Sequence, residues 1–122
     1  MPLFDTTIQA LDQAIGAQGM RLQTINNNIS NVNTPGYKRK DVEFDGMLRD
    51  ALASGDPNAV RNLAPEVKSD PNAVAMRADG NSVDIDQEMA FLAETNVRYN
   101  ALIQMAAHKI HNLEYVISEG RR

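Results

Sequence analysis

The sequence of 122 residues contains no cysteine and no tryptophan, and only 5% of its residues are aromatic. The absence of cysteine excludes disulfide bonds, thiolate metal ligands and a cysteine nucleophile. Large aromatic side chains bury the most area per residue, so a core built largely from alanine, methionine and aliphatic residues is thin. We therefore expect the chain to complete its core with partners or with further copies of itself.

The sequence also lacks an excess of positive charge, a membrane-spanning run and a secretory leader. Its net charge of −4 and its pI of about 5.0 argue against nucleic acid as the main partner. It has no stretch of about 18 apolar residues, and its N-terminus has neither the basic segment nor the continuous apolar run of a signal peptide. These signals alone predict a cytosolic protein, with export by another route left open.

Basic residues cluster at one place in the chain, residues 38–40, with the sequence Lys-Arg-Lys. Asp41, Glu43 and Asp45 follow this cluster closely. We interpret it as a solvated stretch that neutralises its own charge, rather than as a phosphate site.

Near each end of the chain, apolar residues recur at alternating four- and three-residue intervals, which is the a/d pattern of a coiled-coil seam. The N-terminal seam consists of Phe4, Ile8, Leu11, Ile15, Leu22, Ile25, Ile29 and Val32. The C-terminal seam consists of Ile85, Met89, Leu92, Tyr99, Ile103, Ala106, Ile110, Leu113 and Ile117. Two long helices packed antiparallel as a coiled coil follow from this pattern, so the predicted fold is mainly α.

Each seam has one polar member, Gln18 in the first and Asn96 in the second. Each is either an amide tolerated near a solvent edge or a residue that fixes the register of the helices. The C-terminal helix is predicted to start after Asp84, which suits the N-cap position. Gln87, three residues later, can accept from the backbone N–H of Asp84 and so complete a capping box. It is predicted to end at Gly120.

The N-terminal helix must end by about Asn33, because Thr34 precedes a proline and is pushed out of helical geometry. Pro35 and Gly36 then suit the second and third positions of a type II turn, which requires a positive φ at the third. This turn redirects the chain from the helix into the middle of the sequence.

Residues 37–84 form a polar middle segment that holds more than half of the charged residues. One short amphipathic helix is predicted there, ending near residues 54–57 and built around Phe44, Met47, Leu48, Ala51 and Leu52. Residues 65–70 and 73–79 are weak strand candidates that would form a small β-hairpin. The chain is thus divided into a coiled-coil helix at 1–36, the middle segment at 37–84 and a second coiled-coil helix at 85–122.

The first 36 residues carry only three charges, at Asp5, Asp12 and Arg21, and are rich in glutamine and asparagine instead. Neutral amides can be buried when they are paired, without the desolvation penalty of a charge. This composition favours a helix that neighbouring subunits cover on several sides. The alternative is that the clustered asparagines simply cap and fray the end of the helix.

Residues 26–40, NNNISNVNTPGYKRK, resemble the N-terminal signature of the bacterial flagellar axial proteins, the rod and hook family. Members carry a run similar to Ala-Asn-Asn-Ile-Ala-Asn, then two residues and Thr-Pro-Gly with an aromatic residue. The matching positions are Asn27, Asn28, Ile29, Asn31, Asn33, Thr34, Pro35, Gly36 and Tyr37. Asn26 and Ser30 stand where alanine is usual. A second stretch, DGNSVDIDQEMAFLAETNVRYNALIQ, is similar to the proximal rod members of the family.

The resemblance implies a structural subunit of the flagellar basal body, in the proximal rod that transmits motor torque. Copies would stack helically through their terminal helices, with other proximal rod proteins and the rod–export-gate adaptor as partners. Such proteins leave the cytosol unfolded through the flagellar type III export apparatus, without a cleaved signal peptide, and reach the periplasm. Their terminal helices are typically disordered in the free subunit.

The resemblance also implies a site near the N-terminus. Early rod proteins share a Phe-x-x-x-apolar motif that the export gate recognises, and Phe4 and Ile8 match it. Both residues are equally well explained as members of the helix seam, and the two roles are compatible.

No motif predicts an enzyme, a cofactor or a small-molecule substrate. His108, His111 and Glu114 share a helix face but fall short of the ligand set of a metal site. The two neighbouring carboxylates of Asp84 and Asp86 are explained by their position at the N-terminus of the C-terminal helix, where the helix dipole favours negative charge. The alternative function is a soluble coiled-coil adaptor or export chaperone, which would use the same seams but has no reason to carry residues 31–37.

Overall fold

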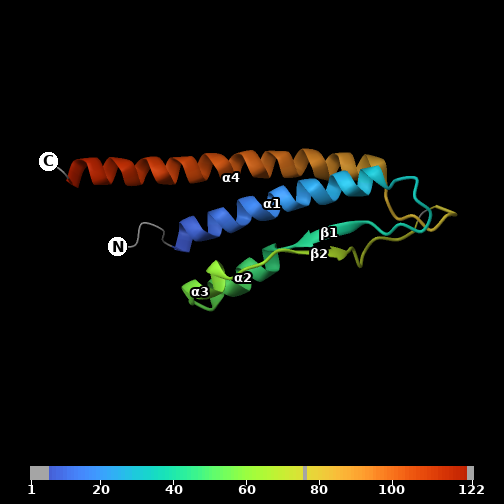
Figure 1. Cartoon of the computed structure of the whole chain (residues 1–122), viewed down its shortest axis with the longest axis horizontal. Helices are drawn as coiled ribbons and strands as arrows, with labels where there is room; N and C mark the ends of the chain where they lie inside the picture. Colours follow the sequence, from blue (N-terminus) through green and yellow to red (C-terminus); the bar gives the residue numbers. More distant parts are fainter. Residues whose placement is uncertain (1–5, 76, 121–122) are drawn as a thin grey trace.

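The computed structural model describes residues 6–75 and 77–120, which form three layers (Figure 1). The long helices α1 (Thr6–Ser30) and α4 (Ile85–Gly120) run antiparallel and make up two of the layers. The third layer lies against the other side of α1 and contains two short strands and two short helices. The predicted mainly α fold with two paired long helices is confirmed, and α1 is the central layer.

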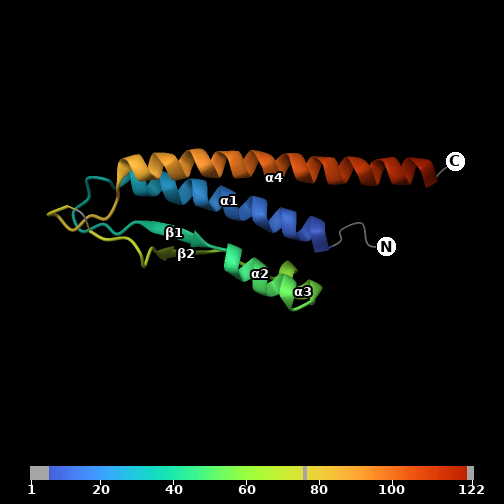
Figure 2. The ribbon, with the colours of Figure 1, turned by 180° about the vertical axis from the view of Figure 1, so that it is seen from behind.

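The two long helices differ in length. With 25 and 36 residues, α1 and α4 are about 37 Å and about 54 Å long at 1.5 Å per residue. They lie close together where α1 ends and α4 begins, and they separate toward the termini of the chain, where α4 continues beyond α1 (Figure 2).

The end of α1 follows the prediction. After Ser30 the chain forms turns, in which the backbone N–H of Tyr37 donates to the carbonyl of Thr34 at 3.2 Å. Gly36 has a φ of 72°, so Pro35 and Gly36 occupy the second and third positions of a type II turn.

The third layer consists of β1 (Lys40–Glu43), α2 (Asp45–Ala53), α3 (Pro57–Arg61) and β2 (Glu66–Ser69). The predicted short amphipathic helix is α2. The helix α3 was not predicted, although Asp56 and Pro57 are a typical helix start: the Asp56 side chain accepts from the Asn58 N–H at 2.9 Å, and proline occupies the first turn.

The predicted β-hairpin is right in one strand and wrong in the other. β2 lies within the first candidate, residues 65–70, but it pairs with β1 and not with residues 73–79, of which the described ones form no strand. The register places Val42 opposite Val67. This pairing prevails because it buries Val42 and the adjacent Phe44 against Ala17 of α1, a long-range gain that local strand propensity does not contain.

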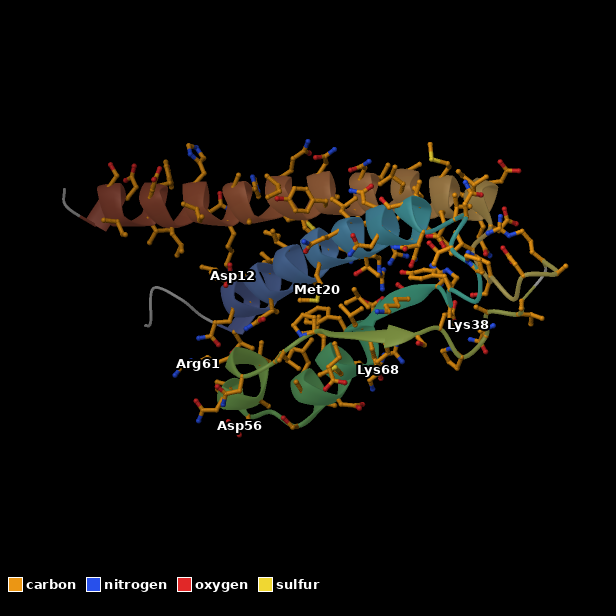
Figure 3. All side chains as sticks on the ribbon, turned by 45° about the vertical axis from the view of Figure 1, so that its right-hand side comes forward. Asp12, Met20, Lys38, Asp56, Arg61 and Lys68 are labelled. Carbon is orange, nitrogen blue, oxygen red and sulfur yellow. The ribbon has the colours of Figure 1, made fainter. Side chains whose placement is uncertain are left out.

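This core between α1 and the third layer is small. Its buried members are Ala17, Val42 and Phe44, with Ala14, Met20, Leu48 and Leu63 packed around them. Met20 lies between α1 and the strands (Figure 3). One aromatic ring among aliphatic side chains is the thin core that the composition predicts.

On α4, Asp84 provides the predicted N-cap, accepting from the backbone N–H groups of Asp86 at 3.0 Å and Gln87 at 3.4 Å. The face of α4 with the least exposure is rotated from the predicted seam. It consists of Glu88, Leu92, Thr95, Tyr99, Leu102, Ala106 and Leu113.

Five members of the predicted C-terminal seam therefore lie at the flank of the helix pair and are 42–53% exposed: Ile85, Met89, Ile103, Ile110 and Ile117. The rotation has a polar cause, because Glu88 and Thr95 are buried in their place. The two polar seam positions differ as a result: Gln18 is buried and Asn96 is exposed.

Candidate functional site

A cluster of mostly buried, hydrogen-bonded polar side chains lies where α1 ends and α4 begins. We call it the polar hub and define it by six residues: Asn28, Tyr37, Arg39, Asp70, Asn81 and Glu88. They come from α1, the turn after it, the end of β2, the segment before α4, and α4 itself.

Asn28 has no exposed surface, and its side chain joins three segments. Its nitrogen donates to the carbonyl of Lys40 at 2.8 Å, and its oxygen accepts from the Lys40 N–H at 3.0 Å. The same oxygen accepts from the Tyr37 hydroxyl at 3.2 Å, and the nitrogen also donates to Glu88 Oε2 at 3.3 Å. The side chain thus pairs with β1 as a neighbouring strand would, which explains an asparagine in the last turn of this helix.

Arg39 is 2% exposed, so the interpretation of residues 38–40 as a solvated stretch is wrong for its central member. Its Nε donates to Glu88 Oε1 at 2.6 Å, its Nη1 donates to Asp70, and its guanidinium lies 4.9 Å from the centre of the Phe91 ring. A buried charge requires such pairing, and the carboxylates that supply it are 31 and 49 residues away in sequence.

The hub shifts the pKa values of two of its members. Burial lowers the pKa of the Arg39 guanidinium, but bonds and charges from Glu88, then from Asp70, outweigh burial and raise it above the ordinary value. Burial, followed by the charge of Glu88, raises the pKa of the Tyr37 hydroxyl. The hub therefore holds a charged arginine and a neutral tyrosine.

Asn81 closes the C-terminal end of α1. It is 1% exposed, and its side-chain nitrogen lies within hydrogen-bonding distance of three carbonyl oxygens, those of Asn31 at 2.9 Å, Val32 at 3.1 Å and Thr34 at 2.7 Å. Its oxygen accepts from the Val83 N–H at 2.7 Å. One amide thus binds backbone carbonyls of the turn that follows α1.

The hub brings the two signature stretches of the sequence together. Residues 26–40 supply Asn28, Tyr37 and Arg39, and the second stretch supplies Asn81 and Glu88. The roles of Arg39, Asp70, Asn81 and Glu88 did not follow from the sequence. No local signal distinguished them, because both stretches contain several other charged or amide residues.

The nine matched motif positions divide into two groups. Asn28, Asn31, Thr34, Gly36 and Tyr37 make bonds within the chain, including Thr34 Oγ1 to Asn31 Oδ1 at 3.1 Å. Of the other four positions, Asn27, Asn33 and Pro35 are exposed, as is the neighbouring Asn26. Bonds within the folded chain explain the first group, and the assembly interpretation stays a prediction for the exposed amides.

At the opposite end, the separating helices leave an apolar cleft of about 430 Å³. Its lining residues include Ile8, Leu11 and Ile15 of α1 and Ala106 and Ile110 of α4. Phe4, the other half of the predicted export motif, lies outside the described residues. The N-terminal seam thus faces α4 at both ends of α1, tightly at Ile25, which is 1% exposed, and loosely at Ile8.

Two further features concern binding chemistry. His108 and His111 are exposed, and within residues 6–75 and 77–120 no three metal-ligating side chains come together. None of the helices in these ranges is long and apolar enough to cross a membrane. The predictions of no metal, cofactor or enzymatic activity stay predictions.

Comparison with known proteins identifies the class. Residues 8–38 match the family described as flagella basal body rod protein. The flagellar basal body rod protein FlgB of Bacillus subtilis (strain 168) is 32% identical over 99% of this chain and 100% of its own. The protein of the same name from Borreliella burgdorferi is 25% identical over 93% of this chain and 97% of its own. The one from Escherichia coli K12 is 23% identical over 95% of this chain and 96% of its own.

The matched residues 8–38 contain most of α1, the type II turn and the start of the hub. Together with the 32% identity along nearly the whole chain, this match shows that the chain is a flagellar basal body rod protein, which confirms the family predicted from the signature. Within that class, the chain belongs to the FlgB family, since the likeness to FlgB proteins runs through both long helices and the middle segment.

Proposed function

We propose that this chain is a structural subunit of the proximal rod, where stacked copies transmit motor torque. The observation that carries the proposal is the apolar flank of α4, defined by Met89, Ile103, Ile110 and Ile117, each 42–53% exposed. The monomer leaves about half of each of these side chains in water, whereas a tube of packed helices would bury the rest against neighbours.

The proposed division of the chain follows from this. Residues 1–36 and 85–122 supply the assembly surfaces, and residues 37–84 hold the two helices in one arrangement through the polar hub. The exposed amides of α1, including Asn26 and Asn27, suit contact with further subunits because they carry no charge. Partners are further copies, other proximal rod proteins and the rod–export-gate adaptor.

The route to the rod is the flagellar type III export apparatus, without a cleaved signal peptide, and the destination is the periplasmic part of the basal body. Phe4 and Ile8 are proposed as the motif that the export gate recognises. Ile8 lines the cleft at the open end of the helix pair, so the folded subunit covers it less than the seam near the hub.

The experiment is deletion of the chain in its source bacterium, followed by electron microscopy of isolated basal bodies. We expect membrane rings without a rod, and rods restored by re-expression of the natural chain. Re-expression of Ile117→Glu is expected to fail, while Gln104→Glu, a matched change at an exposed polar position of α4, is expected to succeed. Intact rods in the deletion strain would contradict the proposed function.

A further inference from the structure

A second, smaller cavity of about 290 Å³ lies beside α1, where α2 and α4 approach it. Its walls are mostly apolar and consist of Ala14, Phe44, Leu48, Ala101 and Leu102. Arg98 and Asp45 also line it and form an ion pair, with Nη1 and Oδ2 3.9 Å apart. The cavity is separate from the cleft at the open end of the helix pair and from the polar hub.

Gln18 is the uncharged polar residue of this lining. The residue is 5% exposed, and within the described part of the chain its Oε1 accepts no hydrogen bond. Buried polar atoms in folded proteins almost always have partners, because an unmade hydrogen bond costs the full desolvation of the group. An apolar cavity with one unsatisfied acceptor is therefore suited to a ligand with an apolar body and a donor at its tip.

A tyrosine side chain has this chemistry, since its ring is apolar and its hydroxyl seeks a partner when buried. Tyr115 is 64% exposed, and it is the one aromatic residue among the exposed large side chains of the described chain. It lies in the last turns of α4, near the terminus that runs on past α1 (Figure 1).

Tyr115 cannot fill the cavity of its own chain. It follows Ala101, which lines the cavity, by 14 residues of one continuous helix. At 1.5 Å per residue these positions are about 21 Å apart. The side chain that enters the cavity must come from another molecule.

We propose that Tyr115 of a second copy of this chain inserts into the cavity and donates its hydroxyl hydrogen to Gln18 Oε1. The proposal rests on the proposed function, because it takes a neighbouring rod subunit as the partner. Because the proposed partner is the next subunit of a rod, the contact is taken to be heterologous and to repeat from copy to copy, whereas reciprocal insertion would close a two-fold dimer. Gln18, an interruption in the seam, becomes the acceptor that recognises the next subunit.

The experiment uses the absence of cysteine in the sequence. Ala101→Cys is placed in one full-length chain and Ser118→Cys, one helical turn after Tyr115, in another. The chains are mixed under mild oxidation, and mass spectrometry measures the rate at which the disulfide between positions 101 and 118 forms. Ala107→Cys, at an exposed position on another side of α4, replaces Ala101→Cys in the control.

We expect the disulfide between 101 and 118 to form at least tenfold faster than that between 107 and 118. Tyr115→Phe in the second chain is expected to slow it about tenfold, because the buried acceptor again lacks a donor. Gln18→Met in the first chain is expected to slow it similarly. The two changes together are expected to restore most of the rate, since neither leaves a polar group unpaired.

Equal rates for positions 101 and 107 would overturn the proposal. So would a rate that Tyr115→Phe leaves unchanged, which is the result if a water molecule satisfies Gln18. Because Tyr115 is exposed, Tyr115→Phe is not expected to disturb folding. The comparison with this variant therefore decides the outcome even if Gln18→Met unfolds the protein. If the disulfide rates contradict the contact but the deletion strain has basal bodies without rods, the Tyr115 contact is wrong and the proposed rod function is still supported.

Discussion

The two ends of the α1–α4 pair are held by opposite chemistry. At the hub end, Asn28, Arg39 and Glu88 are 0–2% exposed and bonded to one another or to backbone. At the terminal end, the helices separate around an apolar cleft, and Ile110 and Ile117 are about half exposed. Specific polar pairing thus fixes how the subunit folds, and non-directional apolar surface is left where neighbours are proposed to pack.

The difference has a physical reason. Buried charges and amides tolerate one arrangement, because any other leaves them unpaired at a high cost. Apolar surface, by contrast, is stabilised by any partner that packs closely enough to exclude water. Four predictions test this contrast between the ends.

Replacement of Glu88 by alanine is expected to destabilise the protein strongly, by about 3–5 kcal/mol, because it leaves the Arg39 guanidinium buried with half of its partners. The measurement is urea unfolding followed by circular dichroism. Glu94→Ala is the matched control: it breaks the exposed 2.7 Å pair with Arg98 on the same helix and is expected to cost under about 1 kcal/mol. Similar losses for both variants would break the contrast.

Gly36→Val is expected to cost about 1–3 kcal/mol, because a β-branched residue is strained at a φ of 72°. Gly46→Ala lies inside α2 with open space around its Cβ position, and a small gain in stability is expected there. Thermal unfolding of both variants provides the test. A Gly36→Val protein as stable as the natural one would show that the turn does not fix the start of the hub.

Ile117→Glu is expected to change the stability of the isolated subunit by less than about 0.5 kcal/mol, because the side chain is 46% exposed, while it abolishes rods. Ile25→Asp is the informative contrast. The N-terminal seam alone suggests that it blocks assembly and spares expression, but Ile25 is 1% exposed, so the buried charge is expected to unfold the subunit itself. Unfolding scans and basal-body microscopy separate the two effects, and a folded Ile25→Asp protein would argue against the packed end.

The smallest expected effect is a loss of stability at alkaline pH. The pKa of Tyr37 is raised in the folded state from its ordinary value of 10.0, so the folded protein holds this proton more tightly than the unfolded chain. Its contribution is full below that value and is lost as the pH rises through the folded pKa. Tyr37→Phe is expected to flatten this part of the stability curve measured by urea unfolding. If the pH dependence of the free energy of unfolding were unchanged in this variant, Tyr37 would not be the group responsible for it.

The sequence predicted what depends on local pattern and missed what depends on distant partners. Helix spans, the Asp84 cap and the turn at Pro35 and Gly36 follow from periodicity and backbone preference, and the structure bears them out. The role of Arg39 did not follow, because its pairing with Glu88 spans 49 residues. The partner of β2 was missed for the same reason.

The rotation of α4 shows how these errors are connected. The a/d pattern places Met89 in the seam, yet the pairing of Glu88 with Arg39 turns the helix so that position 88 faces inward. One long-range ion pair therefore decides which half of the apolar pattern the monomer uses. The remaining half, at Met89, Ile103, Ile110 and Ile117, is what we propose for assembly.

The bonds from α1 to β1 have a consequence for aggregation. Asn28 occupies both backbone groups of Lys40, and Arg21 donates to the carbonyl of Val42 at 3.2 Å, so the outer edge of β1 offers few free groups to another strand. Unprotected strand edges recruit other chains into stacked sheets. The β1 edge of the sheet is thereby closed to a further strand, which would leave the polymerisation that we propose to the helices.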